Sequence, residues 1–174
     1  FVDGDVVGYD FTGYQDVPGS SANKFEVQFK NLKTMANYDL TVEYGTLTVN
    51  KITGLEITFR DVQKEYDGTP ISVPFEKLVM VSPMLIGHKV VFEESEVPTV
   101  VDVADSRDYK VSFKIMEGEK DVTEYYENVT VNSGKFTVTK REGAVVTFAD
   151  QTKVYDGTTL VGEVEATGLA EGQT

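Results

Sequence analysis

The sequence predicts an all-β protein made of tandem small β-sandwich modules of immunoglobulin-like type. Three observations support this prediction. Apolar and polar residues alternate in segments rich in Val, Thr, Phe and Tyr, which is the pattern of half-buried strands. Turn signals containing glycine separate these segments. The segments also recur at an interval of about 90 residues, as expected of tandem modules.

The expected strands follow one another closely along the chain. In LTVEYGTLTV, Gly45 lies midway between two alternating runs, and Gly134 has the same position in the repeat, so both predict a hairpin or a tight bend. The best helix candidate is the segment from Pro74 to Leu85. If it is helical, β-grasp-like modules are the alternative architecture. In chain order, the expected strands cover residues 25–30, 38–51, 55–59, 89–94, 109–115, 129–140 and 144–149.

Two long matches define the repeat. Residues 55–71, LEITFRDVQKEYDGTPI, align without a gap with residues 144–160, AVVTFADQTKVYDGTTL. Residues 39–51 align with residues 128–140, and both offsets are 89 positions. Two independent segments at one offset indicate a true repeat rather than chance similarity.

The repeat predicts how the chain is divided. Residues 52–141 form a complete module, residues 1–51 the second half of a preceding one, and residues 142–174 the first half of a following one. The alternative is two shifted modules, 1–87 and 88–174. Because an isolated half leaves strand edges and an apolar face uncovered, we expect other copies of the chain or neighbouring repeats to complete the end halves.

The motif Lys-x-Tyr-Asp-Gly-Thr begins at Lys64 and again at Lys153. It follows an alternating segment, so we expect a turn that ends a strand. The aspartate side chain can cap such a turn, the glycine can adopt positive φ, and the tyrosine can bury its ring. The motif is therefore interpreted as structural. Its predicted turn residues are Tyr66, Asp67, Gly68, Tyr155, Asp156 and Gly157.

These segments resemble the YDG-type and MBG-type repeats of large bacterial cell-surface proteins. The resemblance rests on the two Tyr-Asp-Gly segments, on Gly168-Leu169-Ala170-Glu171-Gly172, and on the closing element from Asn37 to Lys51. It covers nearly the whole chain, although SPMLIGHKV departs from the Gly-Leu-x-x-Gly-Asp form. The resemblance implies tandem all-β modules in an exported adhesin or stalk, outside the cell, and it implies no catalytic residues.

Composition excludes several classes of function. The net charge is −13, from 29 acidic and 16 basic residues, and such a surface repels phosphate backbones, so no nucleic-acid partner is expected. There are no cysteines and only one histidine, His88, and neither a nucleophile elbow nor a phosphate-binding glycine motif occurs, so we expect no enzyme and no cofactor. Asp3, Asp5 and Asp10 are spaced like calcium ligands but lack the complete loop pattern, so no metal is predicted.

Two functions then remain. The first is a structural spacer that projects a binding region away from a bacterial surface. The second is a module that binds host glycan or a matrix or cell-surface protein. The best candidate contacts for binding are Tyr125 and Tyr126, which adjoin in a segment specific to one repeat. No run of apolar residues is long enough to insert into a membrane.

Overall fold

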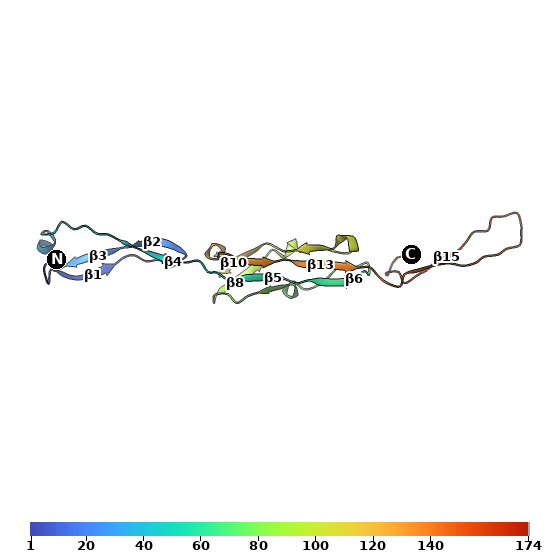
Figure 1. Cartoon of the computed structure of the whole chain (residues 1–174), viewed down its shortest axis with the longest axis horizontal. Coiled ribbons are helices and arrows are strands. Elements are labelled where there is room, and N and C mark those ends of the chain that lie inside the picture. The colour runs from blue at the N-terminus through green and yellow to red at the C-terminus, as the bar shows by residue number, and fades with distance from the viewer. Residues whose placement is uncertain (174) are drawn as a thin grey trace. The chain divides into compact units, whose positions relative to one another are not determined.

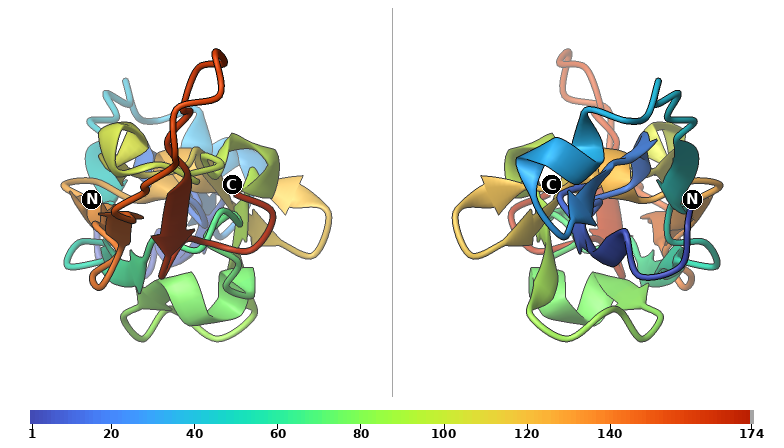
Figure 2. Two further views of the ribbon diagram at one scale, coloured as in Figure 1. Left: turned by 90° about the vertical axis from the view of Figure 1, so that its right-hand side faces the viewer. Right: turned by 90° about the vertical axis from the view of Figure 1, so that its left-hand side faces the viewer.

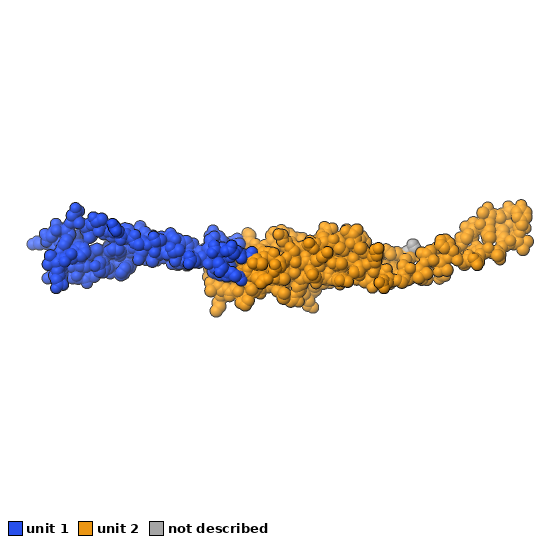
Figure 3. Space-filling view, viewed as in Figure 1, with its two compact units in different colours: residues 1–54, 121–129 blue, residues 55–120, 130–174 orange. Residues whose placement is uncertain are grey.

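A computed structural model of the chain describes residues 1–173 (Figure 1). Strands contain 38% of the residues and helices 10%, which confirms the all-β class. The chain divides into two compact units (Figure 3). One contains residues 1–54 with 121–129, and the other contains residues 55–120 with the chain from residue 130 onward.

The first unit has two antiparallel strand pairs. Strand β1 (Val6–Phe11) pairs with β3 (Phe25–Phe29), and β2 (Gly19–Asn23) pairs with β4 (Gly45–Val49). Its two short helices are α1 (Leu32–Met35) and the 3-10 turn η3 (Thr123–Tyr125). No residue from 1 to 54 is buried. Aromatic contacts such as Phe1 against Tyr38, with ring centroids 5.0 Å apart, are only partly shielded from water.

The second unit holds three three-stranded sheets and one two-stranded sheet, with the strand orders β12-β5-β7, β6-β13-β9, β11-β10-β8 and β14-β15. Its strands are β5 (Glu56–Phe59), β6 (Val62–Glu65), β7 (Val79–Val81), β8 (His88–Phe92), β9 (Arg107–Tyr109), β10 (Phe113–Glu117), β11 (Lys120–Asp121), β12 (Thr130–Asn132), β13 (Gly134–Thr139), β14 (Val145–Phe148) and β15 (Val164–Thr167). Its helical turns are α2 (Phe75–Leu78), η1 (Glu94–Glu96) and η2 (Val103–Asp105).

The core of this unit lies between residues 55 and 138. Strand β5 alternates as its sequence predicts, because Ile57 and Phe59 are buried while Glu56 is exposed. The Tyr109 ring stacks on Phe136 with centroids 4.3 Å apart, and its hydroxyl donates to the Arg60 carbonyl at 2.9 Å. The buried residues of this core are Leu55, Ile57, Phe59, Leu78, Val100, Tyr109, Val111, Ile115, Gly134, Phe136 and Val138, and Ala170 is also buried in this unit.

The first and last strands of this core run parallel. Strand β5 pairs with β12 from Glu56↔Thr130, and β6 pairs with β13 as far as Glu65↔Thr139. Each partner lies 74 positions further along the chain, so both pairs keep one register. Sequence patterning predicts strands here but does not predict which strands become neighbours.

The structure decides two local points that the sequence left open. Neither Gly45 nor Gly134 lies in a hairpin between the segments on its two sides. Strand β4 begins at Gly45 and pairs with β2. Strand β13 begins at Gly134, continues in the same direction as β12 and pairs with the parallel strand β6. Alternation on both sides of a glycine is the same whether the chain reverses or passes to a second sheet. The helix candidate from Pro74 to Leu85 contains one helical turn, α2, followed directly by β7, so the helix required by the β-grasp alternative is not formed there.

The strand pair β14–β15 has little around it. All eight of its residues are exposed, and the fifteen residues that connect the strands, 149–163, contain neither helix nor strand (Figure 2). Isolated two-stranded sheets are marginally stable in water.

Candidate functional site

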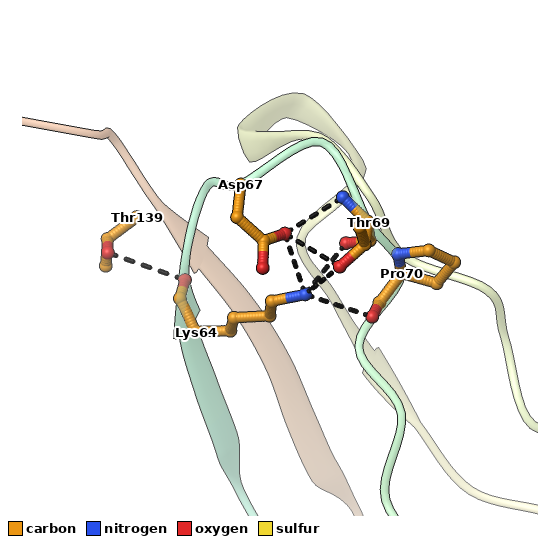
Figure 4. Close-up of polar contacts among 5 residues, drawn as sticks. All are labelled: Lys64, Asp67, Thr69, Pro70 and Thr139. Atoms are coloured by element: carbon orange, nitrogen blue, oxygen red, sulfur yellow. Dashed lines mark hydrogen bonds and ion pairs between the residues drawn. The ribbon is translucent and has the colours of Figure 1, made fainter. Parts of the chain in front are cut away.

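The first Tyr-Asp-Gly segment is a turn fixed by Lys64 (Figure 4). The Lys64 Nζ atom lies 2.8 Å from Asp67 Oδ1. It also donates to the carbonyl oxygens of Thr69 and Pro70, at 3.1 and 3.2 Å, and to the Thr69 hydroxyl at 2.5 Å. Since an ammonium group has three protons, these partners occupy its donor capacity. The lysine therefore closes the turn and is not free to hold a ligand.

Asp67 accepts hydrogen bonds from the other side of the same turn. Its Oδ1 accepts from the Thr69 backbone amide at 2.9 Å and from the Thr69 hydroxyl at 2.8 Å. The hydrogen bond from Lys64, followed by the two from Thr69, lowers the pKa of Asp67 from 3.8 to about 2. The carboxylate is thus held in its charged form as part of the turn.

The second copy of the motif folds in the same way. Lys153 Nζ lies 2.7 Å from Asp156 Oδ1 and donates to the Thr158 hydroxyl. Asp156 Oδ1 accepts from the Thr158 amide at 2.9 Å. The hydrogen bond from Lys153 again lowers the pKa of the aspartate. Since the second copy lies outside the buried core and keeps these contacts, the turn is encoded locally.

Gly68 and Gly157 have φ of +81° and +83°, so the expected positive φ is confirmed at both. The expectation of buried tyrosines failed. Tyr66 is half-buried, and Tyr155 is 91% exposed. The Tyr66 backbone amide donates to the carbonyl of Thr139 on β13, whereas the described residues place no equivalent strand beside Tyr155.

The first turn also contacts the segment that follows β15. Gln173 Nε2 donates to the Tyr66 hydroxyl at 2.7 Å, and Ala170 is buried and lies close to Gly68. Arg141 Nε donates to the Gly168 carbonyl at 2.8 Å. The Tyr-Asp-Gly turn of the repeat 52–141 therefore packs against the Gly-Leu-x-x-Gly element of the following repeat.

A hollow of about 510 Å³ lies beside this junction. It is more apolar than polar, and two cations and one carboxylate stand on its walls. Such a space can hold a small apolar group and offers no pair of carboxylates for acid–base chemistry. Its lining residues are Tyr66, Asp102, Val103, Ala104, Lys140, Arg141, Ala144, Gly168, Leu169, Ala170 and Gln173.

The other sequence candidates do not come together in one site. Tyr126 is buried, with 6% of its surface exposed, so it is not available as a surface contact, and Tyr125 is half-buried. Asp5 accepts a hydrogen bond from the Tyr38 hydroxyl at 2.6 Å, which raises the pKa of Tyr38. Within residues 1–173, no cluster of three or more metal-ligating side chains occurs.

No family model, curated protein or solved structure matches the chain. The resemblance to YDG-type and MBG-type repeats therefore stays a prediction from the motifs. Among the described residues, no helix is long and apolar enough to cross a membrane.

Sequence reasoning missed the roles of Lys64 and Thr69. It assigned the turn to tyrosine, aspartate and glycine, yet lysine and threonine make most of the side-chain hydrogen bonds. The signal was present, because both copies keep Lys-x-Tyr-Asp-Gly-Thr in full. A lysine three positions before an aspartate can reach it within one turn, and that spacing could have suggested the contact.

Proposed function

We propose that the chain is a load-bearing spacer in a bacterial surface adhesin or fibre, built from tandem β-sandwich modules and lying outside the cell. It holds a binding region away from the surface and performs no catalysis. The observation that supports this most is the parallel pairing of the first and last strands of the core, β5–β6 with β12–β13.

Parallel terminal strands resist pulling for a geometric reason. When the two chain ends are drawn apart, β5–β6 is pulled toward its beginning and β12–β13 toward its end. Because these strands are parallel neighbours, the force acts along them and loads their hydrogen bonds together. In an antiparallel terminal pair, the same force would open the bonds one after another. A stalk under tension needs the first arrangement.

The junction between repeats suits the same role. The hydrogen bonds from Gln173 to Tyr66 and from Arg141 to Gly168 connect the end of one repeat to the next. The Lys64–Asp67 turn gives this junction a fixed backbone. A spacer whose joints are fixed in this way transmits force and keeps its direction.

The alternative function is a binding module for host glycan or a matrix or cell-surface protein. Two observations favour it: the apolar hollow beside Tyr66, and the partial exposure of Tyr125. Aromatic rings with a polar edge often contact sugars and proteins. The acidic surface argues against nucleic acid as the partner in either case.

Single-molecule pulling tests the spacer function. With the full chain held by its two ends, we expect one dominant rupture that releases roughly 300 Å of chain, from the 84 residues 56–139 at about 3.5 Å each. The control attaches the force to cysteines introduced by Glu65→Cys and Lys140→Cys, which lie at the same end of the parallel pair. That geometry separates the strands bond by bond and should rupture at lower force.

Equal rupture forces in the two geometries, or extension without a rupture, would refute the load-bearing role. Retention of the chain on a glycan or matrix array, lost in Tyr125→Ala or Arg141→Ala, would support the binding alternative instead.

A further inference from the structure

Both Tyr-Asp-Gly turns contain an Asp-Gly pair, which is chemically labile in unstructured chains. The amide nitrogen of the glycine can attack the side chain of the aspartate, and glycine has no side chain that would hinder this approach. The turn nevertheless requires both residues, because Asp67 accepts the hydrogen bond that closes it and Gly68 has a φ of +81°. The structure of the turn therefore places a reactive pair in each repeat.

The reaction is an isomerisation that needs no reagent other than water. The Gly68 nitrogen bonds to Cγ of Asp67, and one side-chain oxygen leaves as water together with the amide proton, so that a five-membered succinimide ring forms. Water then adds to the ring carbonyl that belonged to the main chain, and the bond from this carbonyl to nitrogen breaks. The chain now continues through the side chain of Asp67, and the product, isoaspartate, has one additional carbon in the main chain.

The contacts of the turn oppose the reactive form of the aspartate. Only a protonated carboxyl group can lose its hydroxyl as water, whereas the carboxylate cannot. Asp67 Oδ1 lies 2.8 Å from Lys64 Nζ and accepts from the Thr69 amide and hydroxyl at 2.9 and 2.8 Å (Figure 4). The hydrogen bonds from Lys64 and Thr69 lower the pKa of Asp67 to about 2. This shift reduces the protonated fraction near neutral pH by roughly 10- to 100-fold.

The same contacts hold the side chain in position. Ring closure joins Cγ of Asp67 to the nitrogen of Gly68, so the carboxylate has to rotate away from its present hydrogen bonds. Lys64 cannot simply follow this rotation, because its Nζ atom also donates to the carbonyl oxygens of Thr69 and Pro70 at 3.1 and 3.2 Å. The turn therefore resists both the protonation and the movement that the reaction needs.

We propose that Asp67-Gly68 and Asp156-Gly157 are latent sites of isoaspartate formation, and that Lys64 and Lys153 each suppress the reaction in their own turn. This assigns the lysine of the motif a role in the chemical durability of the chain. The proposal does not depend on the spacer function, because it concerns contacts within a single turn.

The second copy supports a local mechanism. Lys153 Nζ lies 2.7 Å from Asp156 Oδ1, and the Thr158 amide and hydroxyl donate to the same oxygen at 2.9 and 2.8 Å. This turn lies outside the buried core, so the protecting contacts form without the surroundings of the first turn. Each copy can therefore serve as the control for the other.

The contacts around the first turn show what isomerisation would damage. The Tyr66 amide donates to the Thr139 carbonyl at 2.9 Å, and the Tyr66 hydroxyl accepts from Gln173 Nε2 at 2.7 Å. Gly68 lies close to the buried Ala170. An additional main-chain carbon at position 67 would displace Gly68 relative to Tyr66, so the turn could not keep all of these contacts.

Ageing of the purified chain tests the proposal. The parent chain, Lys64→Met and Lys153→Met are incubated at one mildly acidic pH, and isoaspartate at each Asp-Gly pair is quantified by peptide mapping and mass spectrometry. Methionine keeps the length of the lysine side chain and removes its charge. In Lys64→Met the rate at Asp67-Gly68 should rise by roughly 10-fold, while the rate at Asp156-Gly157 stays as in the parent chain. Lys153→Met should reverse the two results.

Two comparisons keep the test decisive. Lys153 lies in the connection 149–163, outside the buried core, so Lys153→Met gives a result even if Lys64→Met fails to fold. Asp3-Gly4 is the reference pair within the same molecule, since among the described residues no hydrogen bond or ion pair holds the Asp3 carboxylate. In the parent chain it should form isoaspartate faster than the two protected pairs.

Unchanged rates at the adjacent Asp-Gly pair in both lysine variants would overturn the proposal. So would equal acceleration at both turns in a single variant, because that would show general loosening of the chain and not local protection. Isomerisation of Asp67-Gly68 as fast as that of Asp3-Gly4 in the parent chain would also count against it.

Discussion

Replacing Gly134 by alanine tests how closely strand β13 approaches the backbone between β5 and β6. The φ of Gly134 lies outside the left-handed region, so alanine is allowed by the backbone. The obstacle is space, because the added Cβ would lie 2.5 Å from the Arg60 oxygen and 2.8 Å from a ring carbon of Tyr109. The oxygen belongs to the backbone between β5 and β6 and cannot turn aside as a side chain could.

The expected magnitude follows from two opposing effects. Overpacking of a well-packed site destabilises by about 1–3 kcal/mol. Alanine offsets about 0.4–1 kcal/mol of this by restricting the unfolded chain. We therefore expect a net loss of about 1–2 kcal/mol, which lowers the melting temperature by roughly 5 °C or more.

The assay is denaturation followed by tyrosine fluorescence, since the chain has nine tyrosines and no tryptophan. Gly45→Ala is the matched control at low protein concentration, because the same methyl group meets nothing there. It should leave the stability unchanged or raise it by up to about 1 kcal/mol. If both variants melted alike, the contact between Gly134 and the Arg60 carbonyl would not be restrictive.

Two further outcomes follow from the turn and the core. The folded-state pKa of Asp67, about 2, lies below its ordinary value of 3.8, so the stabilising effect of the charged carboxylate is complete above about pH 4 and is lost as the pH falls through about 2. The drop in melting temperature between pH 7 and pH 2 should therefore be smaller in Asp67→Asn than in the parent chain. An unchanged drop would contradict this role of Asp67. Ile57→Ala should lower the free energy of unfolding by about 2–5 kcal/mol in urea titrations, because Ile57 is fully buried. The repeat-equivalent Val146→Ala should change it little at low protein concentration, because Val146 is exposed. Comparable losses in the two variants would show that β14 is covered.

Local chemistry was predictable from the sequence, and strand partners were not. Gly68 and Gly157 adopt the predicted positive φ because an Asp-Gly turn depends on residues within a few positions. Tyr155 is exposed although Tyr66 is half-buried, because burial depends on strand β13, some 73 positions away from Tyr66. The same sequence therefore has different environments in the two repeats.

The hairpin alternative at Gly45 and the helix candidate are both decided by tertiary pairing. An alternating pattern indicates which face of a strand is apolar. It does not indicate whether the chain reverses direction after that strand or continues into another sheet. The segment from Pro74 to Leu85 contains enough apolar residues for a helix, but only Phe75–Leu78 is helical, and Val79–Val81 forms strand β7, which pairs with β5. Tertiary pairing overrides local preference in such short segments.

The contact of Gly134 with Arg60 has a consequence for fidelity. Side chains of a strand repeat every two residues, so sliding β13 past β6 by two positions would keep every apolar side chain inward, and hydrophobic patterning cannot prevent the error. Among the described residues, no polar or charged side chain is buried in the core, so no buried charge would oppose such a slip. Gly134 can prevent it, because a slip by two positions would bring Asn132 or Phe136 under the Arg60 carbonyl, where a Cβ does not fit. A single glycine thus selects one register of β13 against β6 among several that would bury the apolar side chains equally well. This selection matters most in a protein whose neighbouring repeats contain strands of similar sequence.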